Sequence, residues 1–342
     1  VEIDHNHFNC ESSTTTSLEC MIIISAKHVD VHDNVFDNAN YTNSAAINVY
    51  DFVYDTKIRR NIFRPVQGPA SILVGDVQYT YIEDNYFEYC KSCSNNAPIA
   101  LATAAKYTYI RRNLVNALSN FAEFSQNING FIALWWQSGP LTAGQNNGPD
   151  GNISMNSGFV DYIFVEDNVF LGAYQYVQPV QCNNCYQQFT VMEWRRNVLL
   201  VNSGGLGTPP TYSGNNGRLV FEDNIDISDL VLGAGAVGYG HCFMGIGSTN
   251  RVIIRGNRFP HALNFTSSSA YNNICIGGNV VDLVFEDNEI WNNSGVSNPT
   301  SVMPYWYNIS GVKNIIRIRN FDGATGQVLE RMFPPSTPSV PS

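Results

Sequence analysis

Charged residues are scarce in this sequence of 342 residues, and long apolar runs are absent. Only 14% of the residues are charged, against about a quarter in an ordinary globular protein. The formal net charge of −10 leaves no basic surface to release counterions from phosphate, which argues against a nucleic-acid partner. The longest apolar run, residues 131–136, is far shorter than the ~18 residues that a membrane span needs.

Signals for helices, nucleotides and export are also missing. There is no helical periodicity, and no glycine-rich loop leads from a strand into a helix, so nucleotide binding has no support. No signal peptide precedes Val1, because repeat sequence starts at once. We therefore expect the chain to be a mature, trimmed or partial form of its protein. The 41 asparagines and the other neutral polar residues suit a secreted or cell-surface protein.

The eight cysteines form an even set, which suggests four local disulfides formed in an oxidising compartment. A zinc site built from the two CxxC pairs is the alternative. It is disfavoured because the pairs are three to four repeats apart, or roughly 15–20 Å at about 4.8 Å per stacked strand. The candidate disulfide cysteines are Cys10, Cys20, Cys90, Cys93, Cys182, Cys185, Cys242 and Cys275.

One phrase recurs along the chain: alternating apolar residues, two charged or polar residues, an asparagine and another apolar residue, as in TYIEDNYF and LVFEDNID. Alternation with a period of two predicts a β-strand, and a repeat of about 20–50 residues is typical of a solenoid. The anchoring asparagines, mostly 24 to 33 residues apart, are Asn6, Asn34, Asn61, Asn85, Asn113, Asn168, Asn197, Asn224, Asn257, Asn288 and Asn320.

A second short strand precedes most anchors, for example at residues 46–49 and 242–246. Together the patterns predict an all-β fold, a right-handed parallel β-helix of about eleven coils over residues 1–333, followed by a Pro/Ser-rich linker or tail at 334–342. We expect each anchoring asparagine to adopt left-handed backbone geometry and to hydrogen-bond along a column of stacked asparagines. The residue after each asparagine is expected to point into the core.

The asparagine-anchored repeat resembles that of the pectin-lyase-like superfamily of β-helix proteins, over nearly the whole chain. The resemblance implies the fold and suggests an extracellular protein that binds or degrades a polysaccharide or cell-surface glycan, as a hydrolase or a lyase if it is an enzyme. Fold alone does not determine chemistry. The alternative is a non-catalytic structural or adhesive protein of a cell surface, filament or virion fibre. A homo-oligomer stays open in either case.

The two residues before each anchor alternate in sign from the third repeat onward, with a basic pair at 59–60, an acidic pair at 83–84 and a basic pair at 111–112. In a parallel stack these positions lie about 4.8 Å apart, so opposite charges become neighbours and like charges do not. We expect this alternation, which we call the charge ladder, to hold the register of the coils and to penalise a slipped one.

The alternation also predicts the course of the 55 residues between Asn113 and Asn168. A basic pair precedes the first anchor and an acidic pair the second, so the interval should be one coil rather than two. That coil would contain a strand at 131–135 and a Gly/Asn/Pro-rich loop at about 137–158. Long loops on a regular scaffold are where function concentrates.

A column of turn residues is predicted beside this loop, four residues past the central isoleucine of each preceding strand. It comprises Asp51, Asp76, Thr103 and Trp136. Two carboxylates one coil apart would raise one of their pKa values, as a retaining glycosidase requires, and they also suit half of a Ca²⁺ site, the one cofactor that the sequence suggests.

The catalytic candidates are therefore Asp51 and Asp76. The substrate-binding candidates are Trp135, Trp136, Thr103 and Asp150, because tryptophan rings can form a platform for a sugar. The competing interpretation is a pair of ordinary turn aspartates and a tryptophan packed in the core.

A fainter similarity links the chain to polygalacturonase-type glycoside hydrolases. Segments 147–151, 240–242 and 317–319 follow the order of their motifs, as Asn-Gly-Pro-Asp-Gly, Gly-His-Cys and Arg-Ile-Arg. No Asp-Asp pair follows Asp150, and the histidine motif ends in cysteine. The similarity therefore supplies no acid and no water-activating base.

Four of the six histidines, His5, His7, His28 and His32, cluster near the N-terminus. Strand alternation would place His5 and His7 on one face, and His5 would pair with Asp33 across coils. A metal site is one interpretation. Exposed polar groups of the charge ladder are the simpler one.

Overall fold

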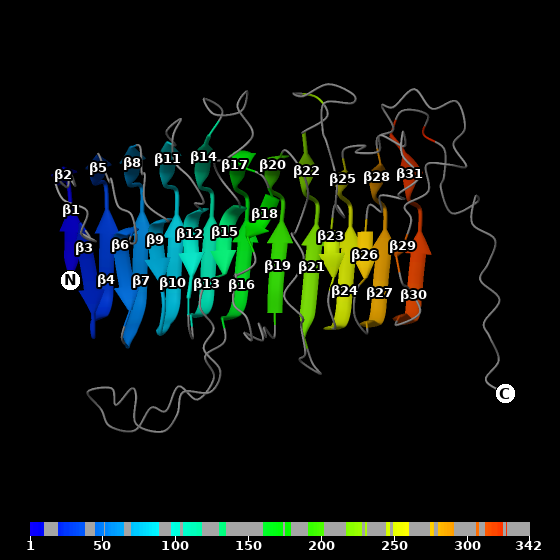
Figure 1. Cartoon of the computed structure of the whole chain (residues 1–342), viewed down its shortest axis with the longest axis horizontal. Coiled ribbons are helices and arrows are strands. Elements are labelled where there is room, and N and C mark those ends of the chain that lie inside the picture. Colours follow the sequence, from blue (N-terminus) through cyan, green and yellow to red (C-terminus); the bar gives the residue numbers. More distant parts are fainter. Residues whose placement is uncertain are drawn as a thin grey trace.

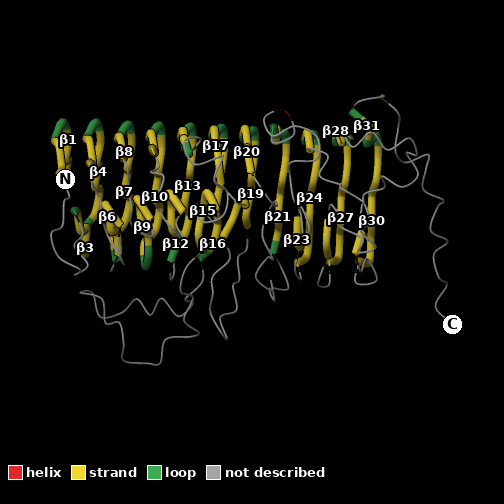
Figure 2. Tube along the Cα trace, turned by 45° about the horizontal axis from the view of Figure 1, so that its top comes forward, coloured by secondary structure: helices red, strands yellow, loops and turns green. Residues whose placement is uncertain are grey.

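The computed structural model is an all-β parallel β-helix, in which successive coils stack along one axis (Figures 1 and 2). Each coil runs through a strand of sheet A, then one of sheet B, and in most coils a strand on a third side. The structure describes residues 1–9, 20–37, 45–50, 52–64, 70–88, 97–102, 105–117, 130–134, 160–173, 175–178, 191–201, 217–227, 230, 244–246, 249–259, 274–276, 280–290, 306–307, 312–323 and 326.

Sheets A and B each contain eleven strands, one for each asparagine-anchored repeat. Sheet A consists of β1 (Glu2–Asp4), β4 (Lys27–His32), β7 (Val53–Arg59), β10 (Val77–Glu83), β13 (Lys106–Arg111), β16 (Asp161–Glu166), β19 (Val191–Arg195), β21 (Arg218–Glu222), β24 (Thr249–Arg255), β27 (Val280–Glu286) and β30 (Val312–Ile318). Sheet B consists of β2 (His7–Asn9), β5 (Val35–Asp37), β8 (Ile62–Arg64), β11 (Tyr86–Glu88), β14 (Leu114–Asn116), β17 (Val169–Ala173), β20 (Val198–Val201), β22 (Ile225–Asp226), β25 (Arg258–Phe259), β28 (Glu289–Ile290) and β31 (Phe321–Asp322).

Within the part of the chain that the structure describes, the third side is formed by two shorter sheets. Sheet C consists of β3 (Met21–Ile24), β6 (Ala45–Tyr50), β9 (Ala70–Val74), β12 (Ala97–Leu101), β15 (Gly130–Leu134) and β18 (Gln175–Gln178). Sheet D consists of β23 (Met244–Ile246), β26 (Ile274–Ile276) and β29 (Trp306–Tyr307). Within each of these two sheets, neighbouring strands pair in register.

The core is a column of stacked side chains inside the coils. The rings of Phe36, Phe63 and Phe87 stack with centroids 4.8–5.0 Å apart, close to the spacing of the strands. Each is the second residue after its asparagine, so the prediction that the first residue points inward is wrong. The asparagine itself points inward and is buried, and strand alternation then sends the next residue, such as Ile62, toward solvent.

The predicted column of hydrogen-bonded asparagines is confirmed. The side-chain Nδ2 of Asn61 donates to Oδ1 of Asn85 at 3.1 Å and to the carbonyl of Val31 at 2.8 Å. The backbone N–H of Asn61 also donates to Asn85 Oδ1, at 3.0 Å. The same pattern recurs from coil to coil and satisfies polar groups that the core would otherwise leave unpaired.

Left-handed geometry belongs to the residue before each asparagine, not to the asparagine as predicted. Arg60, Asp84 and Arg112 have φ angles of 53°, 57° and 53°. This corner residue redirects the chain from sheet A to sheet B. The asparagine can then turn its amide inward, where it reaches carbonyl groups of the neighbouring coil. A single left-handed residue per corner is tolerable in a chain that repeated coils hold in place.

The alternating charges stack in register, as predicted. Glu83 pairs with Arg111 across sheet A, and Arg111 pairs with Glu166. At the corners, arginines reach back one coil: Arg112 contacts Asp84 at 2.8 Å, and Arg196 contacts Asp167 at 2.7 Å. Exposed pairs of this kind contribute only about 0–1 kcal/mol each, so their main effect is on register.

The 55-residue interval is a single coil, because β13 pairs directly with β16 and the N–H of Asn113 donates to Asn168 Oδ1 at 2.9 Å. The loop predicted at 137–158 and the tail at 334–342 lie outside the described residues. No helix in the described part of the chain has the length and hydropathy to cross a membrane.

Candidate functional site

The predicted column of turn residues depends on the alignment of the isoleucines that precede them, and the structure shows these isoleucines aligned. Ile47, Ile72, Ile99 and Ile132 pair in register across sheet C. Of the residues that follow them, Asp76 is described: it is partly exposed, has a φ of 52°, and its carbonyl accepts a hydrogen bond from the backbone N–H of residue 52 at 3.1 Å.

The other members of that candidate site, Asp51, Thr103, Trp135, Trp136 and Asp150, fall in segments that the structure does not describe. The approach of the Asp51 and Asp76 carboxylates, and the Ca²⁺ site that it suggested, therefore stay predictions.

The polygalacturonase-like segments are equally limited. Residues 147–151 and 240–242 are not among those described. Arg319 belongs to the charge ladder, since its guanidinium contacts Asp287 at 2.5 Å and Glu286 at 2.6 Å. Among the cysteines, Cys20 is disulfide-bonded. The side chains of the other seven lie outside the described part, so the pairing scheme also stays a prediction.

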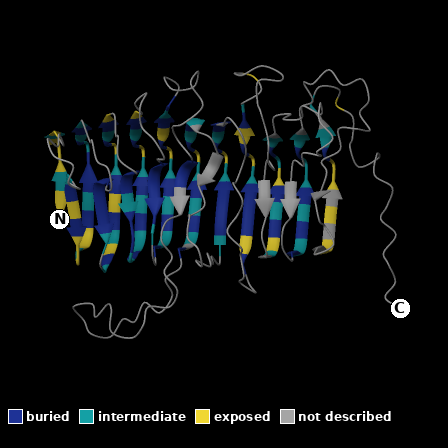
Figure 3. Cartoon of the chain, viewed as in Figure 1, coloured by how far each residue is buried: buried dark blue, intermediate teal, exposed yellow. Residues whose placement is uncertain are grey.

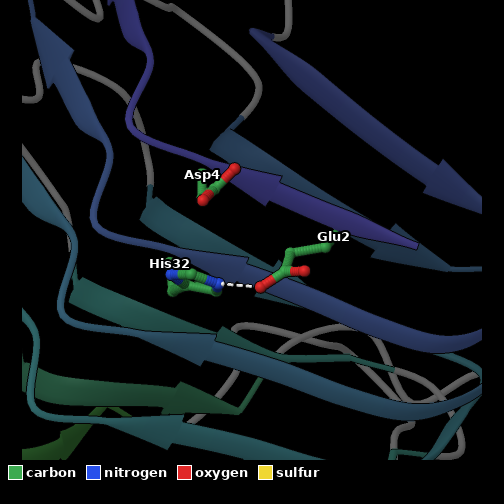
Figure 4. A group of neighbouring side chains, drawn as sticks. All are labelled: Glu2, Asp4 and His32. Atoms are coloured by element: carbon green, nitrogen blue, oxygen red, sulfur yellow. Dashed lines mark hydrogen bonds and ion pairs between the residues drawn. The ribbon is translucent and has the colours of Figure 1, made fainter.

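A compact polar cluster lies in the first coil, where β1 meets β4 (Figure 4). His32 is 8% exposed, and its Nε2 lies 2.7 Å from Oε1 of Glu2. Its Nδ1 lies 2.7 Å from Oδ2 of Asp33. Hydrogen bonds to Glu2 and then Asp33 raise the pKa of His32 above its ordinary value. The ligand atoms of Glu2, Asp4 and His32 all lie within 4.8 Å of one another.

The remaining N-terminal histidines behave differently from the prediction. His5 bonds Asp4 at 3.0 Å rather than Asp33, which the Arg60 guanidinium holds instead. His5 sits at a left-handed corner and His7 in β2, so the two do not share one face of a strand. Each of the three exposed histidines, His5, His7 and His28, has one carboxylate partner.

An aromatic face covers the outer side of four adjacent strands of sheet A, β7, β10, β13 and β16. We define it as Tyr54, Tyr79, Tyr81, Tyr107, Tyr109, Tyr162 and Phe164. The rings of Tyr79, Tyr107 and Tyr162 stack at 4.8 and 4.6 Å. Those of Tyr81, Tyr109 and Phe164 form a second stack at 5.0 and 4.9 Å.

Each of these four strands contains one left-handed residue, which is Asp55, Tyr79, Tyr107 or Tyr162. Figure 3 shows buried and partly exposed positions mixed along the strands of sheet A. In β10, Gln78 and Tyr79 are partly exposed in succession, followed by buried Thr80 and partly exposed Tyr81. The left-handed residue interrupts the alternation of inward and outward side chains, so two successive residues face outward at that point of the strand. Further along sheet A the column of the second stack passes from Phe164 to Glu193 and then to aliphatic residues such as Ile253 and Val284, so its rings end at β16.

Cationic groups border the aromatic face. The guanidinium of Arg111 lies over the ring of Tyr109, with 4.5 Å from Cζ to the centroid. Lys57 is exposed beside Tyr81, and Lys106 is partly exposed beside Tyr107. Neither ammonium has an ion-pair partner among the described residues, in contrast to the arginines of the ladder.

Sequence reasoning missed the aromatic face, although a signal for it was present. The three successive phrases TYIEDNYF, TYIRRNLV and IFVEDNVF carry an aromatic residue at the same place before the charged pair. That place faces solvent, and in-register stacking turns three separate side chains into one continuous surface.

Comparison with known proteins returns no relative: no protein-family model, no curated protein and no solved structure matches the chain significantly. Membership of the pectin-lyase-like superfamily therefore stays a resemblance, and the parallel β-helix is the part of it that the structure shows.

Proposed function

We propose that this chain binds a polysaccharide on the aromatic face of sheet A, as a secreted or cell-surface protein. The observation that carries the proposal is the pair of partly exposed ring stacks on β7 to β16, bordered by Lys57 and Lys106. The disulfide-bonded state of Cys20 supports the extracellular location, because such bonds persist mainly outside the cytosol.

The chemistry of the face suits a sugar polymer. Stacking covers the ring faces, so ring edges and phenol hydroxyls are the parts available to a ligand. Apolar edges can contact sugar C–H groups, while hydroxyls and ammonium groups can hydrogen-bond sugar hydroxyls or carboxylates. Partial burial raises the pKa of Tyr81, which keeps its hydroxyl protonated as a donor.

The geometry of the face suits a linear polymer. Equivalent groups recur at each coil, with ring centroids 4.6–5.0 Å apart, so a chain lying along the axis meets the same chemistry several times. Repeated weak contacts along one chain add up through high effective concentration, which is how a shallow surface can retain a polymer.

The test is binding to a panel of acidic and neutral polysaccharides, by retardation in polysaccharide-containing gels and by calorimetry. The double variant Tyr81→Ser with Tyr109→Ser should lose retention of the bound polymer by at least tenfold. Ile253→Ser with Val284→Ser is the matched control, since it changes the same column of sheet A outside the aromatic face. Equal loss in both variants, or no binding of the wild type to any polymer, would refute the proposal.

A non-catalytic structural role is the second candidate, and the ladders favour it. In the described coils, the asparagine column connects each coil to the next, and ion pairs between the alternating charges link several of the neighbouring coils. A protein of this kind would be resistant to unfolding and would bind no polymer on sheet A, so the same panel separates the two functions.

A further inference from the structure

The cluster of Glu2, Asp4 and His32 in the first coil is supported by contacts with further residues, which the exposed ion pairs of His7 and His28 lack in the described part of the chain. Glu2 and Asp4 lie on β1, and His32 lies on β4, directly beside Asp4 in the register of sheet A. Figure 4 shows the Glu2 carboxylate joined to the His32 imidazole by a hydrogen bond, with the Asp4 side chain near the ring. Three potential ligand atoms within 4.8 Å of one another are held by two paired strands, not by a loop.

His32 is the buried member of this set. Its side chain is 8% exposed, whereas those of His5, His7 and His28 are 75%, 64% and 73% exposed. Nε2 points to the Glu2 carboxylate, and the opposite nitrogen, Nδ1, points to Asp33. A buried imidazole whose ligand atom lies within 4.8 Å of two carboxylates is a group prepared to coordinate a cation.

Asp33 provides an independent indication, because it is not one of the three ligands. Its Oδ2 holds Nδ1 of His32 at 2.7 Å, which fixes the ring and leaves Nε2 as the coordinating atom. Arg60 in turn holds both oxygens of Asp33, at 2.9 and 2.7 Å. A carboxylate behind the imidazole is the usual partner of a metal-binding histidine, where it orients the ring and increases its basicity.

The second carboxylate ligand is oriented as well. Oδ2 of Asp4 accepts from Nδ1 of His5 at 3.0 Å. Two of the three ligands, Asp4 and His32, therefore have a partner of their own outside the set. The pairs His7–Asp37 and His28–Asp55 consist of one histidine and one carboxylate on the exposed surface, without such partners among the described residues.

We propose that Glu2, Asp4 and His32 bind a divalent first-row transition cation such as Zn²⁺, with a fourth position open to water. One imidazole and two carboxylates suit this class, whereas Ca²⁺ and Mg²⁺ prefer oxygen ligands alone. Ligands about 2.1 Å from a tetrahedral ion lie about 3.4 Å apart, so the exposed ends of Glu2 and Asp4 need to shift by only about 1 Å. The ion takes the place of the proton between Nε2 and Glu2, and that proton passes to solvent. The site is independent of the aromatic face.

The experiment is calorimetric titration of the full chain, freed of metal by chelation, with Zn²⁺. Co²⁺ serves as a spectroscopic probe of tetrahedral coordination. We expect one tight equivalent that the double variant Glu2→Gln with Asp4→Asn loses or binds at least 100-fold more weakly. His32→Gln should behave in the same way. His28→Gln, which removes an exposed histidine that also faces a carboxylate, is the matched control and should retain the equivalent.

Asp33→Asn tests the orienting role. It should keep the site but weaken Zn²⁺ binding by roughly 10–100-fold and shift the Co²⁺ absorption band. Because Glu2 and Asp4 are exposed on an edge strand, their double variant reports on the site even if His32→Gln disturbs the first coil. Failure of the wild type to bind Zn²⁺, equal uptake by the wild type and the Glu2/Asp4 variant, or loss of the equivalent in His28→Gln would overturn the proposal.

Discussion

Replacement of Asn85 by alanine should be among the most damaging single changes in the chain. The Asn85 side chain accepts from the N–H and Nδ2 of Asn61, at 3.0 and 3.1 Å, and donates to Ile58 O and Asn113 Oδ1, at 2.8 and 3.0 Å. All four bonds are buried. Asn85→Ala removes them and leaves the N–H of Asn61 without this acceptor.

The magnitude follows from the number of lost bonds. A buried donor left unsatisfied costs about 1–3 kcal/mol, and the three other bonds contribute about 0.5–1.5 kcal/mol each, so we expect a loss of roughly 2.5–7.5 kcal/mol in the free energy of unfolding. Asn314→Ala is the control, because Asn314 is exposed and has one side-chain hydrogen bond, to Asp282 at 2.9 Å. Its loss should stay within about 0.5 kcal/mol.

Urea unfolding measures the free energy, and hydrogen exchange locates the damage. The Asn61 amide should lose protection, while the Asn288 amide, which donates to Asn320 Oδ1 many coils away, should keep it. Coils of a solenoid interact mainly with their neighbours, so the effect should not spread along the whole stack. A change below about 0.5 kcal/mol, or equal loss of protection at both amides, would refute the reasoning.

Three further predictions concern glycine geometry, acid stability and catalysis. Gly172→Ala should destabilise the chain by at least ~1–3 kcal/mol in urea unfolding, because φ is +97° and the new Cβ would lie 2.8 Å from backbone atoms of Ala117. Gly256→Ala should cost less, because the close contact of its Cβ is with the rotatable carboxylate of Asp223. A larger loss in Gly256→Ala than in Gly172→Ala would contradict this explanation. Hydrogen bonds from Arg196 and Arg319 lower the pKa values of Asp167 and Asp287, so these carboxylates stabilise the fold above their unfolded pKa of about 3.8 and lose that effect as pH falls through the lower folded value. The melting temperature should therefore drop below about pH 4, and Arg196→Ala should flatten the drop; an unchanged profile would exclude this linkage. If the wild type depolymerises a glycan, the double variant Asp51→Asn with Asp76→Asn should release no reducing ends. Release at the wild-type rate would remove the turn column from the candidate sites.

The fold was predictable because its determinants recur in the sequence. Asparagine, charged pair and apolar alternation each recur with one period, and parallel stacking is the arrangement that satisfies all three. Two details were predicted wrongly, the left-handed residue and the inward residue after Asn61. Both errors come from the corner: its geometry is set by Arg60, one residue earlier, and the alternation restarts from a buried asparagine.

The candidate sites were less predictable. His32 and Asp33 were visible in the sequence, but their partners were not, because His32 bonds Glu2 from 30 residues away and Asp33 bonds Arg60 from 27 residues away. Simple alternation placed His5 beside Asp33, and the bend at the corner moved it to Asp4. The aromatic face likewise depended on the left-handed backbone of Tyr79, which no residue type indicates.

By itself, therefore, the sequence determined the parallel β-helix, its register and the single coil between Asn113 and Asn168, because periodic patterns specify which residues of neighbouring coils stack on one another. Only the tertiary structure decided which side chains meet across coils: two carboxylates around one buried imidazole, and seven aromatic rings on one outer face. The physical reason is that stacking brings residues 24 to 33 positions apart to within about 5 Å, and the corners and left-handed residues that orient their side chains depend on local backbone angles.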